Sequence, residues 1–129
     1  MKKRYYILTS LIVIIFLSNI PPLGYTFDWL VDETHYKYAT ASGNFSVTDR
    51  SGNNIVAIKK GFKESMDPEK LIADDTVLCR LFWKNPLAFW RYHSYLDKND
   101  PRYKLPYKSE EEIEKRKKEI ADSLKNWIN

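Results

Sequence analysis

The most apolar stretch of the chain lies between Ile7 and Ile20, near its beginning. Basic residues occupy positions 2–4, and Pro21 and Pro22 follow the stretch. A proline pair removes backbone donors and clashes with the preceding turn, so a helix over this stretch should end there. A cationic flank before an apolar helix is typical of an export signal, and the cationic side stays in the cytoplasm. We therefore expect a hydrophobic N-terminal helix with the rest of the chain outside the cytoplasm.

Cleavage of this segment is a separate question. The stretch is short for a full span of about 20 residues, which favours a cleaved signal peptide. Against cleavage, small residues do not occupy both recognition positions of a signal peptidase, because Pro22 precedes the nearest candidate, Gly24, at the critical spacing. Aromatic residues flank both ends, as at the two interfaces of a bilayer. We predict an uncleaved anchor over residues 1–24 that contacts the membrane through residues 5–23, with secretion after cleavage as the alternative.

Residues 35–62 are predicted to form β-structure. Polar and apolar positions alternate at the start of this region and again over 44–48. Turn-forming residues fill 49–54, and the apolar run 55–58 leads out of them. The simplest interpretation pairs 44–48 with 55–58 as an antiparallel hairpin and adds 36–41 as a third strand. A hairpin is marginal in water by itself, so helices must cover it.

Two helices are predicted after the hairpin. An aspartate–proline pair opens residues 67–84 and an asparagine–proline pair opens residues 85–96, and both pairs are typical helix starts. Asp74 and Asp75 fall on the apolar side of the first helix, so either the helix restarts there with an aspartate cap or two carboxylates face that side. Residues 81–95 hold six aromatic side chains, which predicts that these helices pack on the sheet and form the core.

The last helix has the clearest pattern. Ser109 and Glu112 have the spacing of a capping box, and the helix should run to near Asn129. Its apolar stripe favours packing on its own domain, with docking or self-association as the alternative; the stripe is Ile113, Ile120, Leu124, Trp127 and Ile128. The predicted fold is thus α+β: a hydrophobic helix, a small antiparallel hairpin or meander and about three helices, with residues 25–129 as one extracytoplasmic domain.

Charge and composition exclude several classes of function. The net charge of +4 includes +3 from residues 1–23, so the remainder has almost no basic excess and nucleic-acid binding is not expected. One cysteine, two histidines and four glycines leave no intramolecular disulfide, cysteine-rich metal site or phosphate loop. We predict no cofactor, no metal and no assigned catalytic residue.

Three residues were weighed for chemistry. His93 could act as a general base oriented by Asp74 or Asp75, but its position on an apolar face favours a packed core histidine. His35 and Cys79 favour structural roles, Cys79 as a buried, inert thiol. The acidic stretch 97–100 favours a turn over a calcium loop, because it lacks the glycine and the distal glutamate of an EF-hand.

The connector over residues 102–108, which follows Pro101 and contains Pro106, alternates basic and aromatic residues, a combination favoured at recognition surfaces. Its candidate binding residues are Arg102, Tyr103, Lys104, Tyr107 and Lys108. The other interpretation is a connector whose rings fold back onto the domain. We predict a non-catalytic, membrane-anchored envelope protein that binds another envelope protein or the membrane surface. The alternatives are a secreted domain that binds a small ligand or glycan through aromatic residues and, less favoured, a small hydrolase using His93.

Overall fold

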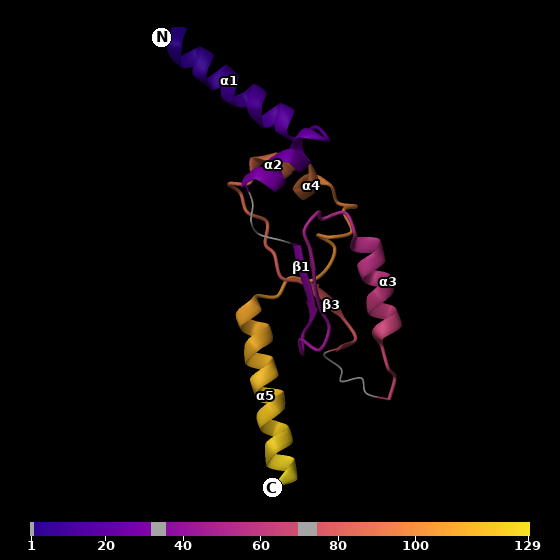
Figure 1. Ribbon diagram of the computed structural model, residues 1–129. Helices are drawn as coiled ribbons and strands as arrows, with labels where there is room; N and C mark the ends of the chain where they lie inside the picture. The colour runs from indigo at the N-terminus through magenta and orange to yellow at the C-terminus, as the bar shows by residue number, and fades with distance from the viewer. Residues whose placement is uncertain (1, 32–35, 70–74) are drawn as a thin grey trace. The chain divides into compact units, whose positions relative to one another are not determined.

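The computed structural model describes residues 2–31, 36–69 and 75–129 (Figure 1). These residues form five α-helices and an antiparallel three-stranded sheet, which confirms the predicted α+β class. The chain divides into two compact units. The first, here called the anchor unit, comprises residues 1–34 and 84–100, and the second, the sheet unit, comprises residues 35–83 and 101–129.

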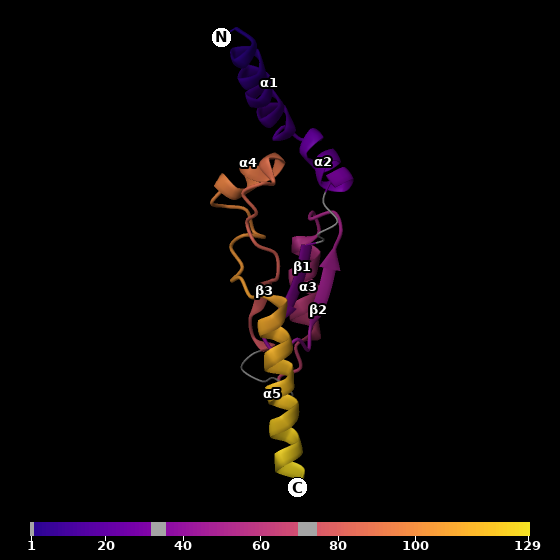
Figure 2. The same ribbon diagram turned by 90° about the vertical axis from the view of Figure 1, so that its left-hand side faces the viewer.

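The anchor unit is helical. Helix α1 (Lys2–Ser18) covers the apolar stretch and ends before the two prolines, as predicted, and α2 (Leu23–Val31) follows. The distant segment 84–100 contributes the short 3-10 helix η2 (Phe89–Arg91) and α4 (Tyr92–Leu96). Figure 2 shows α2 and α4 near the C-terminal end of α1.

The helix predicted over 87–96 is therefore shorter than expected. Asn85 accepts a hydrogen bond from the Leu87 N–H at 3.0 Å through its side chain and from the Ala88 N–H at 3.1 Å through its carbonyl. These bonds close an isolated turn around Pro86. Regular helix then begins only at Phe89, first as 3-10 and then as α.

The sheet has the order β2-β1-β3. Strand β1 (Tyr36–Thr40) pairs antiparallel with β2 (Ser46–Asp49), and Tyr38 lies opposite Val47. Its other edge pairs antiparallel with β3 (Leu78–Arg80). The strand predicted over 36–41 is thus the central one.

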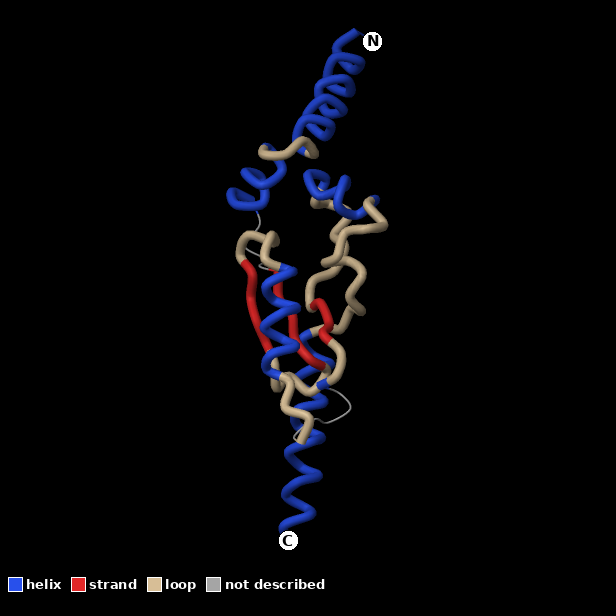
Figure 3. Tube along the Cα trace, turned by 90° about the vertical axis from the view of Figure 1, so that its right-hand side faces the viewer, coloured by secondary structure: helices blue, strands red, loops and turns tan. Residues whose placement is uncertain are grey.

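The strand predicted at 55–58 is wrong, because Ile55 begins helix α3 (Ile55–Ser65). Ile55, Ile58 and Phe62 recur at helical spacing and are the buried residues of α3. The β-branched residues at 55–58 are typical of a strand. In the helix, however, the buried face of α3 covers the sheet with apolar side chains. Figure 3 shows α3 running along the sheet.

The helix predicted over 67–84 is also corrected. The Asp67 carboxylate accepts a hydrogen bond from the Glu69 N–H at 3.1 Å, which forms a turn. Residues 70–74, including Asp74, lie outside the described part of the chain. Leu78 and Cys79 are buried in β3 rather than on a helix. Pairing with β1 outweighs the local helical pattern here.

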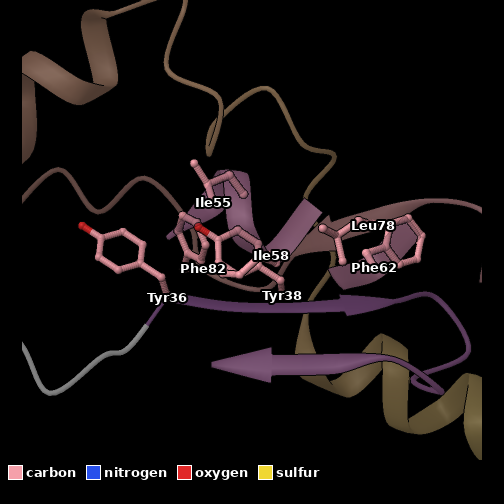
Figure 4. Close-up of a cluster of buried hydrophobic side chains, with 7 residues drawn as sticks. All are labelled: Tyr36, Tyr38, Ile55, Ile58, Phe62, Leu78 and Phe82. Carbon is pink, nitrogen blue, oxygen red and sulfur yellow. The ribbon is translucent and has the colours of Figure 1, made fainter. Parts of the chain in front are cut away.

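The core of the sheet unit lies between the sheet and α3 (Figure 4). It consists of Tyr36, Tyr38, Ile55, Ile58, Phe62, Leu78 and Phe82. The aromatic segment 81–95 is therefore not the core as a whole. Phe82 belongs to it, whereas Trp83 is exposed and the later aromatic residues belong to the anchor unit.

Helix α5 (Glu110–Ile128) confirms the last predicted helix and its cap. The Ser109 hydroxyl accepts a hydrogen bond from the Glu112 N–H at 3.2 Å, and the Glu112 carboxylate accepts one from the Ser109 N–H at 2.8 Å. The Ser109 N–H above all, together with the Ser109 hydroxyl that donates to the Glu112 carboxylate at 3.3 Å, holds the pKa of Glu112 below its ordinary value. Ile113 is the buried residue of this helix.

Candidate functional site

The predicted binding segment forms an extra edge on the sheet. The Arg80 N–H donates to the carbonyl of Pro106 at 2.9 Å, and the Lys108 N–H donates to the carbonyl of Arg80 at 3.1 Å. These bonds place Tyr107 beside Arg80 in a parallel bridge. Residues 106–108 of the connector are therefore held along β3, whereas residues 101–104 form turns.

Arg80 organises the aromatic side chains around this edge. Its guanidinium carbon lies 5.6 Å from the centre of the Tyr103 ring and 5.1 Å from that of Tyr107, within the range of cation–π attraction. Its Nε also donates to the carbonyl of Leu105 at 3.2 Å. Sequence reasoning missed Arg80, because nothing in the local pattern of β3 links it to residues more than twenty positions later.

The five candidate binding residues separate into two groups. Arg102 lies over the Tyr36 ring at 5.1 Å and donates to the carbonyl of Gly52 at 3.3 Å, so it fastens the connector to its own domain. Tyr103 packs against the core and meets the Phe82 ring edge-on at 5.7 Å. In contrast, Lys104 is exposed, Lys108 is half-buried and Tyr107 is 47% exposed. The second group forms the accessible part, which we call the edge surface: Lys104, Tyr107 and Lys108.

The apolar stripe of α5 is mostly uncovered. Ile113 is 4% exposed, whereas Leu124 is 59% and Trp127 92% exposed on the same helical face. Figures 1 and 2 show α5 continuing beyond the sheet. The preferred interpretation of this stripe, packing on its own domain, is therefore right at Ile113 and wrong at the distal positions.

A polar cluster surrounds the one described member of the aspartate pair, Asp75. Its carboxylate accepts hydrogen bonds from the Ser42 hydroxyl and, at 2.8 Å, from the Asn44 amide. Burial alone would raise the pKa of Asp75, but hydrogen bonds from Ser42, Asn44 and Thr40 outweigh burial and lower it. A cavity of about 300 Å³ adjoins this carboxylate and is also lined by Phe45.

The histidine predictions have different outcomes. His93 is exposed, so the packed-core interpretation is wrong. Its Nε2 lies 3.3 Å from the Ser94 hydroxyl. Asp75, a predicted orienting partner of His93, belongs to the other unit and bonds to Ser42 and Asn44. His35 lies outside the described residues. No group of three metal-ligating side chains gathers among residues 2–31, 36–69 and 75–129.

Cys79 and the acidic stretch 97–100 behave as the structural interpretations predicted. Cys79 is 2% exposed, and burial, the largest influence, raises the pKa of its thiol. The Asp97 carboxylate accepts a hydrogen bond from the Asn99 N–H at 2.8 Å, which makes a turn before Pro101.

The anchor unit contains a strongly apolar exposed surface. Every described side chain from Lys2 to Leu17 is exposed, so α1 presents apolar residues on all sides. Within the described chain no single helix is long and apolar enough to cross a membrane. Taken together, α1 and α2 do meet the length and composition required, and they are bent by 98° at the break between them.

Comparison with known proteins finds no matching family model, no similar curated protein and no similar solved structure.

Proposed function

We propose that this chain is a membrane-anchored, non-catalytic interaction protein whose sheet unit lies outside the cytoplasm. The observation that carries the proposal is the surface of α1, which is apolar and exposed on all sides. A helix that is apolar all round requires an apolar environment. The basic residues at positions 2–4 favour a cytoplasmic N-terminus, and with it an extracytoplasmic body.

The interaction role rests on two exposed features of the sheet unit. The edge surface combines Tyr107 and Lys108, whose backbone is held beside Arg80, with Lys104 from the preceding turn. The distal stripe of α5 adds apolar side chains, including Trp127. Tyrosine and tryptophan are enriched at protein interfaces because they combine large contact area with hydrogen bonding. We propose another envelope protein as the partner of these surfaces.

Membrane extraction and protease protection test the anchor and its orientation. The intact chain should stay in the membrane fraction after alkaline washing, with its full mass and with the sheet unit open to protease from the extracytoplasmic side. A soluble chain that has lost its first residues would instead support the secreted alternative. A full-length chain with its sheet unit on the cytoplasmic side would contradict the proposed orientation.

Site-specific photo-crosslinking in cells tests the interaction surfaces. A photoreactive residue at position 107 or 127 should give a discrete protein adduct. The matched control is position 56, because Val56 is apolar, 77% exposed and on α3, away from both surfaces. Equal adducts at all three positions would show only nonspecific proximity, and absence of adducts at 107 and 127 would contradict the interaction role.

A second candidate function is binding of a small ligand, and the cavity beside Asp75 is the observation that favours it. Its volume of about 300 Å³ is at the lower end of ligand sites, and three apolar residues, three uncharged polar residues and two aspartates line it. Met66 also lines this cavity. Replacing Met66 with Trp should abolish any ligand-induced rise in melting temperature, while the edge-surface variant Tyr107→Ala should keep it.

A further inference from the structure

Helix α2 carries apolar side chains both on its packed side and on its exposed side. Gly24, Phe27 and Asp28 turn toward η2: Gly24 is buried, and the Phe27 ring stacks on Trp90 with centres 6.2 Å apart. On the other side Tyr25 is half-exposed and Trp29 is 83% exposed. A short helix of a water-soluble protein normally turns polar residues outward, so the outer side of α2 calls for an apolar cover.

The segment 84–100 shows the same property. Leu87 is 81% exposed and Leu96 is 80% exposed, although both flank the buried Trp90. Single exposed leucines are ordinary on protein surfaces. Here they lie in the same unit as the outer face of α2 and the exposed apolar side chains of α1, which makes an apolar cover the simpler explanation.

Two polar side chains fasten this segment to the helices of the anchor unit. Asn19, just after α1, donates to the carbonyl of Phe89 at 2.7 Å and accepts from the His93 N–H at 2.8 Å. Asp28 accepts from the Trp90 indole N–H and from Arg91 Nε, each at 2.6 Å. Segment 84–100 is thereby held at the C-terminal end of α1.

The geometry of α1 and α2 identifies the cover. Helix α1 has 17 residues, which at about 1.5 Å per residue gives about 25 Å, a little less than the hydrocarbon thickness of about 30 Å. Alone, α1 does not span the hydrocarbon layer, so with residues 2–4 at one interface its C-terminal end lies just inside the opposite one. Because α2 is bent from α1 by 98°, an α1 close to the bilayer normal places α2 parallel to the membrane surface. Trp29 and Tyr25 are residue types that favour this depth.

We propose that α2 and segment 84–100 form a shoulder that lies in the headgroup–acyl boundary of the bilayer that holds α1, with Asn19 fastening the segment there. The inference rests on the proposed membrane anchor and adds a second lipid contact. Part of that contact is made by segment 84–100, which follows the three strands of the sheet unit in sequence. The occupant of the shoulder's apolar surface is lipid rather than a protein.

Spin-label accessibility in the full chain tests the shoulder. The chain is reconstituted in phosphatidylcholine–phosphatidylglycerol vesicles and labelled singly in the variants Leu87→Cys, Leu96→Cys, Ile12→Cys and Val56→Cys. Oxygen concentrates in the bilayer and a polar nickel complex in water, so their relative effects on relaxation report depth. Cys79 is buried, and the unsubstituted chain shows whether it takes up label.

Labels at 87 and 96 should be relaxed more by oxygen than by nickel, as at 12, whereas the label at 56 should show the reverse. If 12 reports lipid while 87 and 96 report water, the shoulder is overturned and the anchor stands. If 12 also reports water, the anchor itself fails. Labels at 87 and 96 that are shielded from both reagents would indicate a protein cover and would also overturn the proposal.

The variant Asn19→Ala tests the fastening. With the label at 87, this change should shift accessibility from oxygen toward nickel, while a label at 12 in the same variant keeps its lipid signature. Continued oxygen accessibility at 87 would overturn the role assigned to Asn19.

Discussion

The carboxylate of Asp28 lies 2.6 Å from Nε of Arg91, although 63 residues separate the two in sequence. The Arg91 side chain is only 6% exposed in this pair. Removing one partner of a buried pair leaves the other charge without compensation, which is more costly than losing the pair's net attraction. This contact therefore controls whether segment 84–100 stays folded against α2.

The variant Asp28→Asn should destabilise that segment by about 3 kcal/mol, because it removes the carboxylate that lies 2.6 Å from the buried Arg91 Nε. Local opening would then rise about a hundredfold, and the amides of 89–96 should exchange faster by the same factor in detergent micelles. Asp122→Asn is the control, since Asp122 is an exposed residue of α5. Equal exchange in both variants would show that the pair does not hold the segment.

Truncation of Tyr103 should destabilise the fold much more than truncation of Tyr107. Tyr103→Ala removes a ring packed on the core and should cost about 3 kcal/mol of unfolding free energy. Tyr107→Ala loses mainly a half-exposed contact with Arg80, worth about 1 kcal/mol or less. Urea unfolding followed by near-ultraviolet circular dichroism measures both.

Photo-crosslinking at position 127 of the Tyr107→Ala variant supplies the control for binding. Loss of a specific adduct with the fold intact would assign Tyr107 to the interface. If instead Tyr107→Ala unfolds the domain as Tyr103→Ala does, the division of the connector into fastening and accessible residues is wrong.

Local sequence patterns were reliable where short-range physics decides the structure. The cap formed by Ser109 and Glu112 involves residues three positions apart, and the proline pair limits α1 through its own backbone. In each case the interacting groups are neighbours in the chain.

Long-range contacts account for the errors. The run beginning at Ile55 has β-branched residues and a helical spacing at once, and only the need to cover Tyr38 favours the helix. The environment of Arg80 and the partner of Asp28 depend on segments brought together by the fold. An apolar stripe alone also does not show which of its residues find a partner, as α5 demonstrates.

The two ends of the α5 stripe should differ in stability effect. Ile113→Ala should cost about 2–4 kcal/mol, since its side chain is buried. Leu124→Ala should change the unfolding free energy by less than about 0.5 kcal/mol, because that side chain is exposed in the isolated chain. Thermal unfolding at several protein concentrations measures both, and a large, concentration-dependent loss in Leu124→Ala would mean that copies of the chain already cover the stripe.

Acid should destabilise the sheet unit through Asp49 and Asp75. Burial opposes ionisation of Asp49, but hydrogen bonds from Asn54 and Ser51 outweigh it, so both aspartates have a lowered pKa in the folded state. Their stabilising effect is complete above the unfolded-state pKa of about 3.9 and is lost as the pH falls through the folded-state values. Urea midpoints should therefore be flat from neutral pH to about pH 5 and decline below about pH 4.

The variant Asp49→Asn checks the assignment. An amide does not ionise, so the decline in the urea midpoint on acidification should be smaller than in the unsubstituted chain. The exposed Asp122→Asn should keep the full decline. An unchanged pH profile in Asp49→Asn would contradict a contribution from Asp49.

Cys79 should report unfolding rather than form intermolecular disulfides. Its thiol is buried in β3 and its pKa is raised mainly by burial, so little reactive thiolate is present at neutral pH. Maleimide should modify the native chain much more slowly than the chain in denaturant.

Val56→Cys is the matched control, because position 56 is exposed and should react at once in the native state. A native Cys79 that reacts as fast as Cys introduced at 56, or a disulfide-linked dimer on non-reducing gels, would show that β3 opens readily. Slow modification would place Cys79 among the structural residues of the sheet, in line with its pairing opposite Ala39.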